Sequence, residues 1–264
     1  MIDPDFFGCS GKLSYEETRS LVSASGKTKP SGDFSDFVSK GRIVTSVDRV
    51  HRCAKQWDRF ARIALNHAFG DVVCAGATPS HVMLSFEFGI DVSPSERVAC
   101  SNAFAHELAA RNIAQGKCHS SHGFGVSAVT IATLATAPTR HQPSLRRGNI
   151  YLSRPIGVFK LHYLAELGID ISAKDVLSLL EMPRDEDFHR ASWGLMTDVS
   201  GHGLIGAAAQ AAEFHGIEIS LNMSAEHAIS PEVLSIPVEC LQNPVTSYGI
   251  PSLNWDARAA SLAT

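Results

Sequence analysis

The sequence predicts an α/β protein with α+β character, organised as two domains. Strand-forming and helix-forming runs alternate as strand, helix, strand, helix, strand through the first half of the 264 residues. A polar stretch rich in proline and arginine, residues 138–148, then separates this half from a second strand and helix series, as an interdomain linker does. We therefore expect a flexible N-terminal segment (1–32), a first domain (33–138) and a second domain (149–264).

Each element of the first domain has its own signal. The β-rich run 41–48 ends in an acid, and apolar residues recur at helical spacing through residues 57–75. Ser93, Pro94 and Glu96 have the spacing of a helix start, and Gly116 is expected to end that helix near residue 115. Strands are expected at 81–89 and 126–135, and in the second domain a strand at 149–153, helices within 158–180 and a strand-to-helix unit at 203–215.

Composition excludes several classes of protein. Hydrophobic residues make up 44% of the chain and charged residues 19%, which are ordinary values for a globular protein. The net charge of −4 argues against a nucleic-acid binder, and no apolar run approaches the ~20 residues that a membrane span needs. The start of the chain lacks the features of a signal peptide, and six cysteines without CxxC spacing fit a reducing compartment. A cytoplasmic location is the expectation.

Four acids lie in similar contexts, each at the end of an apolar or β-prone run: Asp33, Asp48, Asp71 and Asp198. Carboxylate oxygens are the ligands that Mg²⁺ prefers, and phosphoryl-transfer sites share the metal between a few acids and the nucleotide phosphates. Any one of these acids could equally cap a helix or turn a loop. Three glycines follow Asp198 within a helix start, which permits close approach of an anion.

Five segments of the chain resemble one family. Residues 196–206, MTDVSGHGLIG, are similar to the MTDVTGFGLLGH segment of the selenophosphate synthetases, or selenide, water dikinases. The other four segments occur in the family's order and at similar spacing. Two lie in the first 80 residues: GCSGKLS at 8–14 (family GCGCKLS), and RIA at 62–64 with GDVVCAGATP at 70–79 (family RIA…SDVYAMGGKP). The other two are GKCHS at 116–120 (family AGGHS) and GNIYLSRPIG at 148–157 (family GxxLxLTKPLG). The resemblance covers roughly residues 8–255, although the family's late DPQTSGG motif has no counterpart in 243–264.

The resemblance implies the two-domain fold of the aminoimidazole-ribonucleotide synthetase superfamily, with a reduced C-terminal domain. The first domain would bind ATP and pair with a second copy in a homodimer, and Mg²⁺ would be bound by aspartates. Carried over residue by residue, Asp33, Asp71 and Asp198 would be metal ligands, with Asp71 also at the nucleotide. Cys9 and Lys12 would be catalytic, and the nucleotide would contact Lys12, Asp48, Lys117, Cys118 and His119.

The activity expected from these observations is ATP- and Mg²⁺-dependent phosphoryl transfer to a small nucleophile. Selenide is the acceptor that the resemblance implies, giving selenophosphate, AMP and phosphate. Two alternatives remain open: transfer to a different small metabolite, and a non-catalytic paralogue that only binds nucleotide. We also expect the strands of the first domain to be apolar on both faces, as in 81–89, so that two sheets pair in the homodimer.

Overall fold

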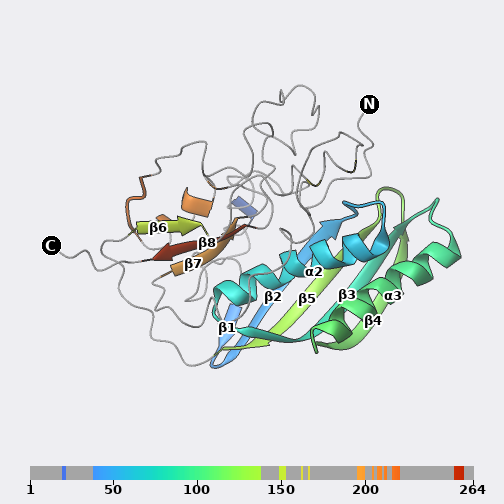
Figure 1. Ribbon diagram of the computed structural model, residues 1–264, viewed down its shortest axis with the longest axis horizontal. Helices are drawn as coiled ribbons and strands as arrows, with labels where there is room; N and C mark the ends of the chain where they lie inside the picture. The colour runs from blue at the N-terminus through green and yellow to red at the C-terminus, as the bar shows by residue number, and fades with distance from the viewer. Residues whose placement is uncertain are drawn as a thin grey trace, which may run out of the picture.

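The computed structural model contains two sheets and two long helices (Figure 1). It describes residues 20–21, 38–137, 149–152, 162, 166, 195–199, 204, 207–209, 211–212, 216–220 and 253–258, and every structural statement below concerns these residues. The predicted site residues Cys9, Lys12 and Asp33, the N-terminal segment 1–32 apart from two helical residues, and the linker 138–148 lie outside them. The domain boundaries therefore stay predictions.

A five-stranded sheet forms the larger unit, with strand order β1-β2-β5-β3-β4. The strand β5 (Ala128–Thr136) lies between β2 (Ile43–His51) and β3 (Thr78–Gly89), antiparallel to both. Its small and β-branched residues fit an interior strand that packs on both edges. The outer strands are β1 (Val38–Lys40) and β4 (Ala114–Gly123). Only β3 and β4 are parallel in this sheet, because a helix connects them.

Both helices, α2 (Trp57–Cys74) and α3 (Pro94–Ala110), cover the same face of this sheet (Figure 1). Three phenylalanines hold the layers together. Phe104 of α3 packs edge-on against Phe60 of α2, with ring centroids 5.7 Å apart, and against Phe86 of β3 at 5.2 Å. Such aromatic contacts add directional preference to the burial of apolar area. The core of the larger unit is therefore the layer between the sheet and these two helices.

The helix α2 is buried on nearly all sides. From Phe60 to Cys74 every residue except Arg62 is buried. One side faces the sheet, and Val199, Leu204, Ala207 and Ala208 belong to the same buried core. Burial on nearly all sides is typical of a helix enclosed between two layers. The second layer includes a three-stranded antiparallel sheet of order β6-β8-β7, formed by β6 (Asn149–Leu152), β8 (Leu253–Arg258) and β7 (Leu195–Val199).

Most predicted elements of the first half are confirmed, with one substantial correction. The helix α2 matches its prediction to within one residue, and Ser93 and Glu96 form the expected capping box of α3. The prediction that α3 reaches residue 115 is wrong. It ends at Ala110, since Asn112 has a positive φ of 56° that breaks the helix, and residues 114–123 form β4 instead.

The face of the five-stranded sheet opposite the helices, which we call the open face, is mixed in character. Val82, Leu84, Phe86 and Phe88 of β3 all point to the buried side, so the expectation that this strand is apolar on both faces is wrong. The exposed apolar side chains Ile43, Val47, Met83 and Leu134 lie on strands of this sheet. They share the open face with an ion pair in which Arg49 Nη2 lies 3.0 Å from Glu87 Oε2.

Candidate functional site

A serine and two aspartates meet between the sheet and α2. Ser46 and Asp48 alternate with Val47 on β2, so both point toward the helices. Asp71 approaches them from the last turn of α2. The Ser46 hydroxyl donates to Asp71 Oδ2 over 2.6 Å, and Asp48 Oδ2 lies 3.3 Å from the same Ser46 Oγ. Both carboxylates are therefore within hydrogen-bonding reach of one hydroxyl group.

His67 completes this group, which we call the Ser46 cluster (Ser46, Asp48, His67 and Asp71). It precedes Asp71 by four residues, so the helix places both side chains on one side of α2. His67 Nε2 lies 3.6 Å from Asp48 Oδ1, an ion pair that exists only when the imidazole is protonated. The side chain of His67 is buried and that of Asp48 is 17% exposed. The cluster thus joins two acids, a hydroxyl and an imidazole at the edge of the core.

The donors of the Ser46 cluster suit a hard divalent cation. Two carboxylates held close together repel each other unless a proton or a cation lies between them. Mg²⁺ takes oxygen ligands and is commonly held by only one or two carboxylates, with substrate phosphates and water completing its shell. Among the residues that the structure describes, no group of three or more His, Cys, Asp or Glu side chains has the arrangement of a metal site. Two carboxylates therefore fit a shared metal–nucleotide site better than a closed protein site.

Asp198 lies on β7, outside the five-stranded sheet. It is buried, and its strand neighbours Thr197 and Val199 are also buried. The Thr197 hydroxyl donates to the carbonyl oxygen of Asp198 over 3.3 Å. The strand β7 contacts α2, and Val199 belongs to the same core as Phe60. The chain thus brings the strand that carries Asp198 to the helix that carries Asp71, while its role as a metal ligand stays a prediction.

The predicted nucleotide contacts Lys117, Cys118 and His119 lie on the edge strand β4, where all three are exposed. In the sheet, β5 and β3 separate this strand from β2. At the usual strand spacing it is roughly 14 Å from β2. Although Cys118 is exposed as a residue, partial desolvation of its thiol raises the pKa of that group above its ordinary value. These residues therefore form a separate group from the Ser46 cluster.

Ser46 and His67 are the members of the cluster that sequence analysis missed. The signal for Ser46 is its position two residues before Asp48 on a strand, which places both side chains on one face. The signal for His67 is its spacing of four residues from Asp71 on a helix. Neither spacing predicts a site residue by itself. It does so only when the neighbouring acid, Asp48 or Asp71, has already been identified as part of a site.

The fold is shared with solved structures of low sequence identity. Comparison with models of protein families gives no match, and comparison with curated proteins gives none. Thiamine monophosphate kinase from Aquifex aeolicus matches with a TM-score of 0.66 at 13% identity, covering 93% of this chain and 90% of that chain. A structure of AaThiL complexed with AMPPCP and TMP matches with a TM-score of 0.65 at 14% identity, covering 94% and 88%.

A third match extends the comparison beyond the kinases. HypE of E. coli, a hydrogenase maturation protein, has a TM-score of 0.59 at 14% identity, and the match covers 82% of this chain and 71% of that one. No helix among the described residues is both long and apolar enough to cross a lipid bilayer. These matches show that the chain shares the α/β fold of the thiamine monophosphate kinase and HypE structures.

Proposed function

We propose that the protein transfers a phosphoryl group from ATP, with Mg²⁺, to a small nucleophile. The observation that carries this proposal is the Ser46 cluster, in which Asp48 and Asp71 share one hydroxyl group inside this fold. AMPPCP, found in one structure of the same fold, is ATP with a methylene group in place of the β–γ bridging oxygen. The phosphates of a nucleoside triphosphate and two adjacent carboxylates together supply oxygen ligands of the kind that Mg²⁺ requires.

Each residue of the cluster has a distinct part in this proposal. Asp48 and Asp71 would hold the metal, which neutralises charge on the phosphates during transfer. The Ser46 hydroxyl, donating to Asp71 Oδ2, limits the rotation of that carboxylate. His67, whose Nε2 lies near Asp48 Oδ1, would hold the Asp48 carboxylate in a similar way. Positions fixed in this way support a reaction in which positioning and charge neutralisation supply most of the rate enhancement.

The remaining predicted residues extend the same proposal. Asp33 and Asp198 would add metal ligands, and Lys12, Lys117, Cys118 and His119 would contact ATP. Cys9 would bind the acceptor, for which the segment GCSGKLS supports selenide. Lys12 is three residues from Cys9 in the sequence, and a neighbouring cation would favour the thiolate form that attack on a chalcogen needs.

A second acceptor class has its own support. The solved structure of this fold that holds AMPPCP also holds TMP, a phosphate ester. Transfer to a small metabolite of this kind, through an oxygen nucleophile, keeps the same ATP site and gives Cys9 no chemical task. The two acceptors therefore make opposite predictions for one substitution.

The test is steady-state ATP hydrolysis with and without selenide, together with phosphorus NMR of the products. Selenide-dependent hydrolysis that disappears in Cys9→Ser, with ATP affinity unchanged, supports selenophosphate synthesis. Selenide stimulation that survives in Cys9→Ser contradicts the thiol mechanism. No stimulation in the parent protein, but a phosphorylated product in a screen of small metabolites, supports the second acceptor class. Absence of any ATP turnover refutes the enzymatic proposal and leaves a nucleotide-binding paralogue.

The proposal includes a homodimer formed through the open face. Ile43, Val47, Met83 and Leu134 place exposed apolar area on three neighbouring strands, β2, β5 and β3. A second copy of the same face would cover this area by a two-fold axis. Val47, with 66% of its surface exposed, is the most exposed of the four. Val47→Glu should therefore shift a dimer to monomer in sedimentation, and a monomeric parent protein at micromolar concentration would contradict the pairing.

A further inference from the structure

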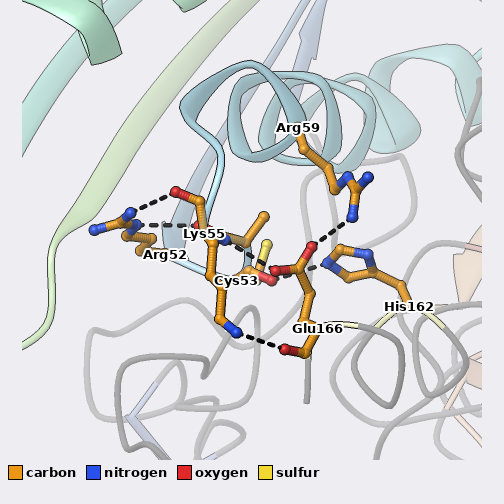
Figure 2. A network of polar contacts seen from close by, with 7 residues as sticks. Arg52, Cys53, Lys55, Arg59, His162 and Glu166 are labelled. Carbon is orange, nitrogen blue, oxygen red and sulfur yellow. Dashed lines mark hydrogen bonds and ion pairs between the residues drawn. The ribbon is translucent and has the colours of Figure 1, made fainter. Parts of the chain in front are cut away.

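Two residues of the second half of the chain, His162 and Glu166, contact the beginning of α2 (Figure 2). Arg59 Nη1 lies 2.6 Å from Glu166 Oε1, and the backbone N–H of Lys55 donates to Glu166 Oε2 over 3.1 Å. Lys55 Nζ donates to the carbonyl oxygen of Glu166 over 2.9 Å, and His162 Nε2 donates to the carbonyl oxygen of Cys53 over 2.9 Å. We call this group of five residues the Glu166 junction.

The two junction residues from the second half are buried, and the loop that they contact is held in place by Arg52. The Glu166 side chain is only 5% exposed, and His162 is buried as well. Arg52 stabilises the loop before α2, since its guanidinium donates to the carbonyl oxygens of Ala54 and Lys55 (Figure 2). The same guanidinium lies 3.8 Å from the centroid of the Trp57 ring. The loop therefore presents its donors and acceptors in a fixed arrangement. Because hydrogen bonds depend on direction, a buried carboxylate bonded to two charged or polar donors holds its segment in one orientation relative to the loop.

The other attachment of the second half to α2 has the opposite character. Val199, Leu204, Ala207 and Ala208 belong to the same buried apolar core as Phe60 of α2, and two of these four side chains are small. Burial of apolar area is non-directional, and small side chains provide little shape to stop one element from sliding over another. The hydrogen bonds of the Glu166 junction are directional and add orientation to this apolar contact.

We propose that Glu166 is a positioning residue for the reaction, holding β7 with Asp198 in register on α2 with Asp71. The proposal rests on the function proposed above. The helix α2 carries Arg59 near its first turn and Asp71 near its last, about 18 Å apart along the axis at the usual rise per residue. In this proposal the segment with Glu166 and the strand β7 move together, so a rotation at the junction would displace Asp198 relative to the Ser46 cluster.

The chain offers a matched control on the same helix. Glu107 of α3 is also a buried carboxylate with two arginine partners, Arg62 at 3.1 Å and Arg111 at 3.2 Å. Among the described residues, the Glu107 carboxylate bonds to Arg62 of α2 and to Arg111 at the end of α3. Glu107→Gln and Glu166→Gln should therefore destabilise the protein in similar ways, whereas only Glu166→Gln should disturb the position of β7.

The experiment compares these two variants in the full chain by ATP turnover and by hydrogen exchange. For Glu166→Gln we expect kcat to fall about 10- to 100-fold, as for a misplaced catalytic group, with an ATP dissociation constant within about threefold of the parent. Adding Arg59→Met removes the unpaired guanidinium and should restore part of the loss. For Glu107→Gln we expect kcat within about twofold of the parent after correction for the folded fraction.

Hydrogen exchange separates failure of this proposal from failure of the proposed function. Amides of residues 195–199 should exchange faster in Glu166→Gln and at the parent rate in Glu107→Gln. Equal kcat in the two variants, or unchanged exchange at 195–199 in Glu166→Gln, would overturn the positioning role. A parent protein without ATP turnover would refute the proposed function, and faster exchange confined to Glu166→Gln would then still support the junction as the attachment of β7.

Discussion

The two long helices lie side by side on one sheet but are stabilised differently. The helix α3 begins with a capping box, with Pro94 in its first turn, and buries only five residues: Cys100, Ala103, Phe104, Glu107 and Leu108. The helix α2 has no side-chain cap at Gln56, yet it is buried along almost its whole length. Local sequence defines α3, whereas packing from two layers defines α2. The enclosed helix also carries His67 and Asp71 of the Ser46 cluster, where low exposure strengthens electrostatic interactions.

The largest expected effect comes from removing the negative charge of Asp71 in the last turn of α2. Asp71→Asn keeps an acceptor for the Ser46 hydroxyl but removes a negative charge from the proposed metal site. We expect ATP turnover to fall at least about 100-fold, since the charge of the phosphates is then left uncompensated. Asp58→Asn, at an exposed position in the first turn of the same helix, is the control and should keep parental turnover. Normal turnover in Asp71→Asn would remove this residue from the site.

The enclosure of α2 is tested by enlarging one side chain in each helix. Ala68 on α2 is fully buried, whereas Ala105 on α3 is exposed. Ala68→Leu should lower the free energy of unfolding by about 1–3 kcal/mol through overpacking. Ala105→Leu should change it by less than about 0.5 kcal/mol. Urea unfolding of both variants measures the difference, and equal effects would show that the two helices are packed alike.

The Glu166 junction at the start of α2 should make the stability of the protein depend on pH, whereas α3 should not. Burial lowers the pKa of His162 below its ordinary value of 6.5 in the folded state. Below pH 6.5 the unfolded chain therefore binds the proton more readily, and stability declines as the pH falls toward the lower folded-state pKa, by up to about 1.4 kcal/mol per pH unit. His162→Gln should flatten this slope. His106→Gln, at an exposed position on α3, should leave it unchanged.

The smallest expected effect concerns the helix starts themselves. The Ser93 side chain accepts a hydrogen bond from the Glu96 amide, and Glu96 Oε2 lies 2.9 Å from the Ser93 amide nitrogen. Ser93→Ala should cost about 1 kcal/mol of stability. Gln56→Ala at the start of α2 should cost much less, because the Gln56 side chain makes no capping bond. A similar loss in both variants, measured by thermal unfolding, would contradict the view that only α3 depends on its cap.

The same contrast explains which features could be predicted from the sequence. The span of α2 was predictable because apolar residues recur through it, and the start of α3 because its capping box is local. The strand β4 was not, since AQGKCHSSHG has no apolar alternation and depends on pairing with β3. Asp48 and Asp71 could be singled out as acids after apolar runs. Their meeting at Ser46 could not, because that contact spans 25 residues of sequence and depends on tertiary packing.

The position of β5 between β2 and β3 has a consequence for the order in which a nascent chain folds. The unit from β3 through α3 to β4 can form from consecutive residues, whereas β2 has no partner in the sheet beyond β1 until β5 is synthesised. Val47 pairs with Ala132, so the chain must be extended by 85 residues, from 47 to 132, before this contact closes. Such long-range closure slows folding. Residues 46–51, including the strand half of the Ser46 cluster, are therefore expected to stay unpaired until β5 is synthesised and to take their final place late.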